Sequence, residues 1–439
     1  MSTLQSISVD HFRFLVPEGA ISRRVVRAFL VLVALAALGL VFSKPVPSAS
    51  AGESYYVDSQ GGSDSNPGTS EAAPWRTLAS VHALKFLPGD VVHFKHGSSW
   101  TGGLVIDDSG LEGSPITFTT YGTGSRPVFS NPGGAGSWTK AVTIRASWVV
   151  LEGILVRDAH EAGVAIPDDS DHNVVRDVEV TNVGIGASVY GDSNLVTQSY
   201  LHDLHMEVNT PGGDDDYGAV AVVLSGLGNE VSYNRMLNCI APSYDYDGGA
   251  VEWWGTADGS YVHHNWAKGN NGFFEVGRGS ARNTVVAYNV AVDNGDFFYI
   301  HFRDQFGSVV EDFRIENNTI VERSNGQSRW MVFGFSDNPT STTLLMRNNI
   351  ISVSGFQGVA NTWGFTHENN LYDLHNVSQG SFSLGPGEFS ADPLFANPLA
   401  DDFHLKAGTR AIDSGLALGH GLDFDGPPPR DSRGHTLGA

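Results

Sequence analysis

Short β-rich runs that each end in an asparagine recur along the second half of the chain, and this feature constrains the fold most. Two examples are Val262-His263-His264-Asn265 and Val285-Val286-Ala287-Tyr288-Asn289. The marker asparagines are spaced unevenly, by 31, 24, 29, 31 and 21 residues. A β-propeller or a leucine-rich array would need a fixed spacing, whereas a β-helix keeps the core of each rung and lets its loops vary. The markers are Asn234, Asn265, Asn289, Asn318, Asn349 and Asn370.

Asparagine suits the corner of a rung, because it tolerates left-handed backbone and its side chain can bond neighbouring backbone groups. Asparagines stacked on successive rungs can also bond one another. A β-sandwich with many Asn turns is the alternative, but no amphipathic helices and no tight hairpin signals interrupt the series. The sequence therefore predicts an all-β fold, a right-handed parallel β-helix.

The first part of the chain contains the only convincing helix signal. The helix is predicted to begin within Pro74–Val81, with apolar positions at Leu78, Val81 and Leu84, and to stop at Pro88-Gly89-Asp90. An uncovered first rung would expose apolar core and unpaired strand edges. We therefore expect this short helix to cap the N-terminal end of the solenoid.

Residues 1–51 have the pattern of a secretory signal peptide. Basic Arg23, Arg24 and Arg27 precede the apolar run 28–42, and a cleavage signature lies at residues 49–51. The apolar run is shorter than the roughly 20 residues of a membrane span, so cleavage and export are expected rather than anchoring. The predicted organisation is a signal peptide at 1–51, an N-terminal cap with the first rungs at 52–140, the β-helix with the active-site face at 141–390, and a C-terminal rung and tail at 391–439.

The charge of the chain limits its partners. Removal of residues 1–51 takes away five basic and two acidic residues, which leaves 21 basic and 46 acidic residues and a net charge of −25. Such a surface repels nucleic acid and anionic lipid headgroups. It also disfavours a polyanionic substrate unless a cation intervenes. The single cysteine, Cys239, excludes an intrachain disulfide.

Three acidic segments, residues 214–221, 245–254 and 270–278, align without gaps at offsets of 31 and 23 residues. Carboxylates this frequent on short hydrophobic strands are unusual unless they serve a function. We expect the three segments to be successive rungs. The alignment places Asp216 over Asp247 and Asp247 over Asn270, and places Ala221 over Glu252 and Glu252 over Glu275.

Glu252 and Glu275 are the principal catalytic candidates. On adjacent rungs about 4.8 Å apart they cannot both ionise easily, so one pKa should rise and the two should divide the roles of acid and base. Carboxyl groups about 5 Å apart suit a retaining glycosidase, and groups about 6.5–9.5 Å apart an inverting one. Asp247 is the third catalytic candidate. Pairing it with either glutamate would give the wider separation between carboxyl groups and an inverting reaction.

Several side chains around these acids are predicted to bind substrate. Of the adjacent residues Trp253 and Trp254 one should face inward, and the outward one, taken as Trp254, can stack on a sugar ring. Competing interpretations are an ion pair of Glu275 with Arg278, and a Ca²⁺ site or a solvated turn at Asp214–Asp216. No His/Cys spacing suggests zinc, no cofactor is predicted, and Ca²⁺ is the one metal ion with a candidate site. The predicted substrate-binding residues are Asp216, Trp254, Arg278, His301 and Arg303.

Both ends of the chain resemble a known family. The opening Tyr56-Val57-Asp58 with Gly62–Gly68, the segment Pro88–Gly97, and the ending Ala391–Phe395 with Asp402–Gly415 are similar to secreted right-handed parallel β-helix proteins of the pectate-lyase type. The resemblance implies the fold and work on carbohydrates. It does not identify the reaction, because that superfamily contains lyases, hydrolases and epimerases.

The paired acids favour a glycoside hydrolase acting on a polysaccharide or oligosaccharide. The alternative is a polysaccharide lyase or a C5-epimerase, because Gly272–Val276 resembles the alginate-lyase and chondroitinase-B group, in which such a Glu helps to hold Ca²⁺. That group has a lysine base five residues after its Glu, where this chain has Ser280. Arg278, His301 or Lys268 would have to supply the base. A non-catalytic glycan-binding protein would not need the paired acids and ranks last.

Overall fold

The computed structural model describes residues 52–439, except residues 135, 213–215, 245–246, 301–306, 324–328, 334–339, 355–363, 376–382, 420–423, 425–437 and 439. The predicted signal peptide at 1–51 lies outside the described residues. Within the described residues no helix is both long and apolar enough to cross a membrane.

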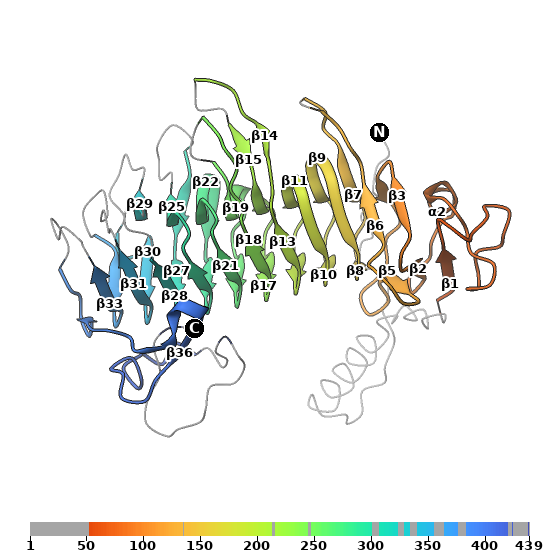
Figure 1. The fold of residues 1–439 in the computed structure, drawn as a ribbon. Coiled ribbons are helices and arrows are strands. Elements are labelled where there is room, and N and C mark those ends of the chain that lie inside the picture. Colours follow the sequence, from red (N-terminus) through yellow and green to blue (C-terminus); the bar gives the residue numbers. More distant parts are fainter. Residues whose placement is uncertain are drawn as a thin grey trace, which may run out of the picture. The chain divides into compact units, whose positions relative to one another are not determined.

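The described chain is a parallel β-helix made of three ladders of parallel strands (Figure 1). The first ladder, here ladder A, contains one short strand from each rung, and its neighbours are parallel throughout. Ladder A consists, in spatial order, of β1 (Ser54–Val57), β2 (Val91–Lys95), β5 (Ile116–Tyr121), β8 (Val149–Glu152), β10 (Val174–Arg176), β12 (Leu195–Thr197), β17 (Glu230–Ser232), β20 (Tyr261–His263), β23 (Val285–Ala287), β27 (Phe313–Glu316), β30 (Leu344–Arg347) and β32 (Thr366–Glu368).

Ladder B follows ladder A within each rung and shares two long strands with ladder C. Its strands are β3 (Ser99–Thr101), β6 (Val128–Ser130), the first parts of β9 (Leu155–Ile166) and β11 (Glu179–Val189), β13 (Tyr200–His202), β18 (Arg235–Leu237), β21 (Trp266–Lys268), β24 (Val290–Val292), β28 (Thr319–Glu322), β31 (Ile350–Ser354), β33 (Leu371–His375) and β34 (Phe389–Ser390).

Ladder C carries the acidic strands. It consists of β4 (Leu104–Ile106), β7 (Lys140–Ile144), the second parts of β9 and β11, β16 (Val220–Leu224), β19 (Gly249–Thr256), β22 (Gly272–Arg282), β25 (Asp296–Ile300) and β29 (Arg329–Phe333), and β26 (Val309–Glu311) pairs with the end of β22. The three ladders confirm the predicted all-β parallel β-helix.

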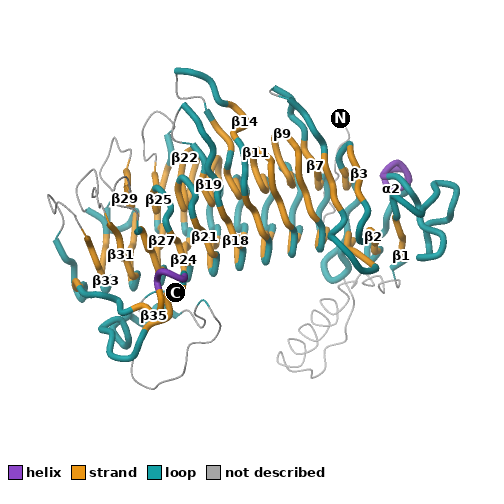
Figure 2. The backbone as a smooth tube through the Cα atoms, viewed as in Figure 1, coloured by secondary structure: helices purple, strands orange, loops and turns teal. Residues whose placement is uncertain are grey.

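Few elements lie outside the ladders, and loops join most of the strands (Figure 2). An antiparallel hairpin of β14 (Met206–Val208) and β15 (Tyr217–Gly218) projects beyond the neighbouring rungs (Figure 1). A second antiparallel pair, β35 (Phe395–Asn397) and β36 (Asp402–Leu405), flanks the short 3₁₀ helix η1 (Pro398–Ala400) near the C-terminus.

The predicted capping helix is present as α2 (Leu78–Ala83). Leu78 and Val81 are buried in the same apolar cluster as Trp75 and Phe86. The helix therefore extends the core beyond the first rungs, as its apolar spacing predicted.

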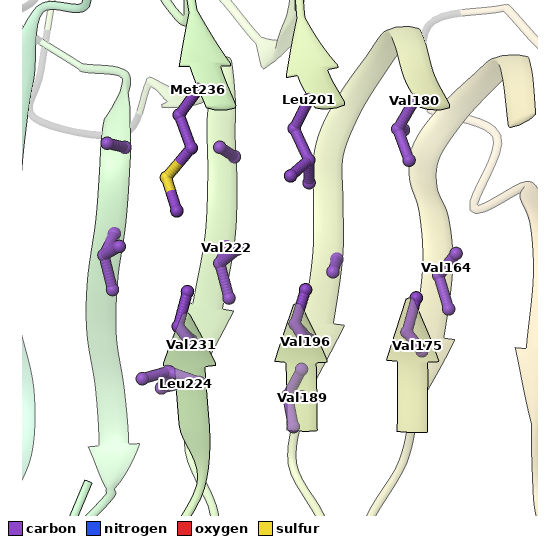
Figure 3. Packing of buried hydrophobic residues seen from close by; sticks show 14 of the residues in the cluster. Val164, Val175, Val180, Val189, Val196, Leu201, Val222, Leu224, Val231 and Met236 are labelled. Atoms are coloured by element: carbon purple, nitrogen blue, oxygen red, sulfur yellow. The ribbon is translucent and has the colours of Figure 1, made fainter. Parts of the chain in front are cut away.

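The core is a continuous apolar column between the ladders. Alternate side chains of each strand point inward, and successive rungs place valines and leucines above one another (Figure 3). Val196 of β12, Leu201 of β13 and Val222 of β16 come from ladders A, B and C and belong to this single cluster. The core thus explains why the strands are short and rich in branched aliphatic residues.

The marker asparagines form the predicted stack. From Asn265 onward, each marker's amide oxygen accepts a bond from the backbone N–H of the marker one rung before, as from Asn234 to Asn265 at 3.0 Å and from Asn265 to Asn289 at 3.0 Å. The Asn265 side-chain nitrogen also donates to the Asn289 oxygen at 3.0 Å and to the Val231 carbonyl at 2.8 Å. All six markers are buried.

One detail of the corner prediction is wrong. The left-handed backbone belongs to the residue before each marker, for example Tyr233 (φ 56°) and His264 (φ 54°), and the markers themselves are not left-handed. The turn therefore occurs one residue earlier. The asparagine is needed for its side-chain donors and acceptor, which replace backbone bonds that the corner interrupts.

Candidate active site

The two catalytic candidates are register partners in ladder C. Glu252 of β19 pairs with Glu275 of β22, so their backbones lie one rung apart, about 4.8 Å. Both side chains are half-buried. The sequence alignment predicted this pair, and the register confirms it.

Strand alternation turns Glu252 and Trp254 to the outside of the solenoid. Their neighbours Val251 and Trp253 belong to the core, and Trp253 is fully buried. Trp254 is 37% exposed. The predicted division between an inward and an outward tryptophan is confirmed, and the outward indole shares a face with the Glu252 carboxyl group.

A β-bulge at Gly277 arranges this face. Trp253 pairs with Val276, but Trp254 pairs with Arg278, so Gly277 is an extra residue in β22. A Cβ atom on Gly277 would lie 2.6 Å from Trp254 Cε3 and 3.4 Å from Glu252 Oε1. Only glycine therefore leaves room for the indole ring beside the carboxyl group.

The surroundings of Glu252 favour its protonated form. Burial raises the pKa of Glu252 well above its usual value, and the nearby carboxylates of Glu275 and Asp247 raise it further. Glu252 keeps part of its surface exposed, but protein atoms surround its carboxyl group closely enough for burial to dominate. The raised pKa favours the protonated form of Glu252, beside the Glu275 carboxyl group on the next rung.

The predicted alignment is wrong one rung earlier. Val223 of β16, and not Ala221, pairs with Glu252. The difference arises because Tyr217 and Gly218 leave the rung to form β15 of the hairpin, and β16 begins only at Val220. The Gly-Ala-Val motif repeats in sequence, but its first residue, Gly218, belongs to the hairpin here.

The predicted stack of Asp247 on Asn270 is also wrong. The Asn270 side chain accepts the backbone N–H of Cys239 at 2.8 Å, and its own backbone N–H donates to Asn294 at 3.1 Å. Asn270 thus belongs to a second corner stack. Asp247 lies in the loop before β19, where its Oδ1 accepts the Gly248 N–H at 2.7 Å.

Asp216 joins two loops at the edge of this face. Its carboxylate accepts the backbone N–H of Thr210 at 2.6 Å and that of Tyr244 at 2.9 Å. Asn209 donates to the Pro242 carbonyl at 2.7 Å across the same pair of loops. The structure therefore gives Asp216 a role in holding the loop that leads to Asp247. Its predicted role in substrate binding stays a prediction.

The basic candidate residues lie in different parts of the chain. Arg278 is exposed and in register with Trp254, and its ion pair with Glu275 stays a prediction. Lys268, a candidate lyase base, is bonded through Nζ to Asp401 Oδ2 at 2.5 Å on ladder B. His301 and Arg303 lie outside the described residues.

Metal binding gains no new candidate. Among the described residues no group of three or more His, Cys, Asp and Glu side chains could hold a metal ion. The Ca²⁺ site at Asp214–Asp216 stays a prediction, because Asp214 and Asp215 lie outside the described residues.

Sequence reasoning missed a second acidic group near the start of ladder C. Lys140 of β7 forms an ion pair with Glu161 of β9, and the Tyr217 hydroxyl donates to Glu207 Oε1 at 3.3 Å. Burial, and then the Glu161 carboxylate, raise the pKa of Glu207 to about 7. The signal that could have revealed it is a glutamate between two apolar residues in Met206-Glu207-Val208.

Comparison with known proteins gives a fold and one short sequence match. No family model matches the chain. A lacto-N-biosidase from Bifidobacterium longum subsp. longum is 34% identical over 128 residues, which cover 24% of this chain and 8% of that protein. The chain thus spans less than a tenth of the length of this curated relative.

Two solved structures illustrate the comparison. Pectate lyase Pel9A has a TM-score of 0.64 at 18% identity, covering 89% of this chain and 96% of that one. A lacto-N-biosidase of family GH136 from Eubacterium ramulus has a TM-score of 0.43 at 14% identity, covering 74% and 68%. The similarity to Pel9A shows that the chain has the pectate-lyase-like parallel β-helix fold.

Proposed function

We propose that this protein is a glycoside hydrolase that cleaves a neutral or weakly charged polysaccharide or oligosaccharide, with Glu252 and Glu275 as its catalytic pair. The observation that carries the proposal is the register pairing of Glu252 with Glu275 on the outer face of adjacent rungs. The short match to a lacto-N-biosidase supports a glycosidase.

The raised pKa of Glu252 assigns the roles. Glu252, whose pKa is raised, is the proton donor, and Glu275 is the nucleophile. In the first step a Glu275 oxygen bonds to the anomeric carbon while the glycosidic bond breaks, and the leaving oxygen takes the Glu252 proton. In the second step Glu252 takes a proton from water, and the water oxygen displaces Glu275. The anomeric configuration is retained.

The side chains around Glu252 and Glu275 suit an uncharged sugar ring. Trp254 offers a flat apolar face next to the Glu252 carboxyl group. Asp247 adds a further negative charge that contributes to the raised pKa of Glu252. A uronate carboxylate would meet three acidic groups at this position, so repulsion disfavours it.

Elimination by a polysaccharide lyase remains the second candidate, and the exposed Arg278 beside Trp254 is the observation that favours it. An arginine on this face could neutralise a uronate. Lys268 is a weak candidate for the base, since it is bonded to Asp401.

The test is to incubate the protein with neutral and uronate-containing glycans and to follow new reducing ends and ultraviolet absorbance together. The neutral set includes lacto-N-tetraose, xylan and β-glucan, and the charged set alginate and polygalacturonate. We expect reducing ends from a neutral glycan, no absorbance, no loss on chelation, and no turnover by Glu252→Gln or Glu275→Gln. Absorbance that rises with reducing ends and disappears with chelator would establish a lyase instead.

A further inference from the structure

The β14–β15 hairpin brings a buried carboxyl group onto the start of ladder C. Glu207 lies at the centre of β14, and its Cβ would be 3.1 Å from a Cβ placed on Gly184 in β11. Glycine at 184 therefore lets the hairpin pack directly against the rung. Glu207 is 6% exposed in this position.

The bonding of Glu207 is incomplete, and a second buried Glu–Tyr pair in the same protein shows what a complete one looks like. Glu388 accepts from Asn370 at 2.6 Å, from the Tyr372 hydroxyl at 3.0 Å, and from the Gly385 N–H at 2.6 Å. Glu207 accepts only from Tyr217, and its enclosed Oε2 has no hydrogen-bond partner among the described residues. A buried carboxyl oxygen without a hydrogen-bond partner is costly, so it calls for an explanation other than structural support alone.

The groups in front of Glu207 reach solvent. The side chains of Lys140 and Glu161 are 30% and 18% exposed, and Tyr217 is half-buried. Together they offer an ammonium donor, a carboxylate acceptor and a hydroxyl that both donates and accepts. Such a mixed set matches the hydroxyl groups of a neutral sugar, which also donate and accept.

Tyr190 connects this group to the catalytic pair. Burial raises the pKa of the Tyr190 phenol, followed by the negative charges of Glu252, Glu161 and Glu207. The phenol therefore lies within electrostatic range of both acidic groups. Tyr190 directly follows β11. Ser188 of β11 pairs with Val223, which pairs with Glu252, so β11 lies two rungs from Glu252, about 10 Å.

We propose that Lys140, Glu161 and Tyr217 form a distal subsite for a neutral sugar unit of the same oligosaccharide that is cleaved at Glu252 and Glu275, with Glu207 behind them as a positioning residue. The inference rests on the proposed function and extends it. The substrate is a neutral oligosaccharide longer than a disaccharide, because a chain must span the three rung steps from β9, which carries Glu161, through β11 and β16 to β19, which carries Glu252, about 14 Å.

Binding by calorimetry tests this without turnover. In a Glu275→Gln background, the probes are lacto-N-tetraose, xylotetraose and cellotetraose, each with the disaccharide of the same series. We expect at least one tetrasaccharide to bind about tenfold tighter than its disaccharide at pH 5.5. Adding Glu161→Ala should reduce this ratio to near one while disaccharide affinity stays constant. Lys140→Ala gives the same readout if Glu161→Ala does not fold.

The positioning role of Glu207 has a pH signature. Ionised Glu207 would place a second negative charge against Glu161 and draw Lys140 away from a sugar hydroxyl. We therefore expect the tetrasaccharide advantage to fall at pH 8.5, and to become independent of pH in Glu207→Gln. The matched control is Glu388→Gln, which should leave the ratio unchanged. The titratable groups around Glu207 are Lys140, His160, Glu161, Tyr190, His205 and Tyr217.

The outcomes separate this inference from the proposed function. If affinity depends on oligosaccharide length and on Glu161, but the protein releases no reducing ends, the subsite proposal stands and the hydrolase proposal is rejected. Reducing ends without a length dependence would reject the subsite alone. The subsite is also rejected if no tetrasaccharide binds, or if Glu161→Ala and Lys140→Ala leave the ratio unchanged.

Discussion

The asparagine corner and the glutamate pair both stack identical side chains on successive rungs, yet the physical result is opposite. A stacked amide donates from its nitrogen to the oxygen of the next, as Asn265 does to Asn289 at 3.0 Å. A stacked carboxylate can only accept, so Glu252 and Glu275 repel until one holds a proton. Repetition of a residue at one rung position thus stabilises the corner after ladder A, whereas in ladder C it produces a repulsive pair of carboxyl groups.

The largest effect should come from neutralising the glutamates. Glu252→Gln and Glu275→Gln should each lower kcat about 10²- to 10⁴-fold, while the melting temperature stays the same or rises because a repulsive pair is relieved. Steady-state kinetics and calorimetric melting measure both. A variant that keeps full activity, or one that loses stability in proportion to activity, would contradict the claim that the glutamates serve catalysis while the corner asparagines serve stability.

The asparagine stack should respond in the opposite way. Asn265→Ala removes the acceptor of the Asn234 N–H and the donor to the Val231 carbonyl, leaving buried groups unbonded. We expect a loss of about 3 to 4 kcal/mol in the free energy of unfolding, measured by urea denaturation. Asn397→Ala, at an exposed position, is the control and should change little. A loss as small as that of the control would mean that the stack does not stabilise the fold.

The pH dependence of stability sharpens the comparison through Glu207. Its pKa is about 7 in the folded protein against 4.5 as a free group, so the folded state holds the proton more tightly. Stability should therefore be greatest below pH 4.5 as far as this group is concerned, and fall as pH rises towards 7. The expected loss is on the order of 2 to 3 kcal/mol. Glu207→Gln should remove this contribution from the slope measured by urea titrations across the range, while the contribution of Glu252 stays. An unchanged slope would show that Glu207 does not contribute to it.

The smallest effect concerns the bulge. Gly277→Ala would place a methyl group 2.6 Å from the Trp254 ring, so the indole must move away from Glu252. We expect a cost of about 1 kcal/mol in stability and a rise in KM of about tenfold, with kcat less affected. Gly134→Ala is the matched control, because a Cβ there meets nothing within 4 Å. Equal effects of the two variants would show that the bulge does not position the site.

The sequence predicted the fold and the register pairing of Glu252 with Glu275 for one reason: rungs repeat, so residues at one rung position recur as a pattern. The marker asparagines and the offset between Glu252 and Glu275 are local to neighbouring rungs and need no knowledge of the loops. Where a loop makes its own structure, the prediction failed, as when β15 took Tyr217 and Gly218 out of the rung.

The second acidic group was beyond the reach of the pattern for a related reason. Lys140, Glu161, Glu207 and Tyr217 come from different rungs and from a hairpin that folds back onto β11. Their proximity depends on Gly184, which has no side chain to signal a contact. Burial of Glu207 and the charge of Glu161 then raise the pKa of Glu207, and both causes exist only in the folded protein.

The most direct test of the central claim is the configuration of the first product, followed by proton NMR as a β-linked neutral oligosaccharide is cleaved. Glu252 and Glu275 on adjacent rungs predict retention, so the β-anomer should appear first and then mutarotate. Initial appearance of the α-anomer would contradict the pair and implicate a wider spacing such as that to Asp247. An unsaturated product would contradict hydrolysis altogether.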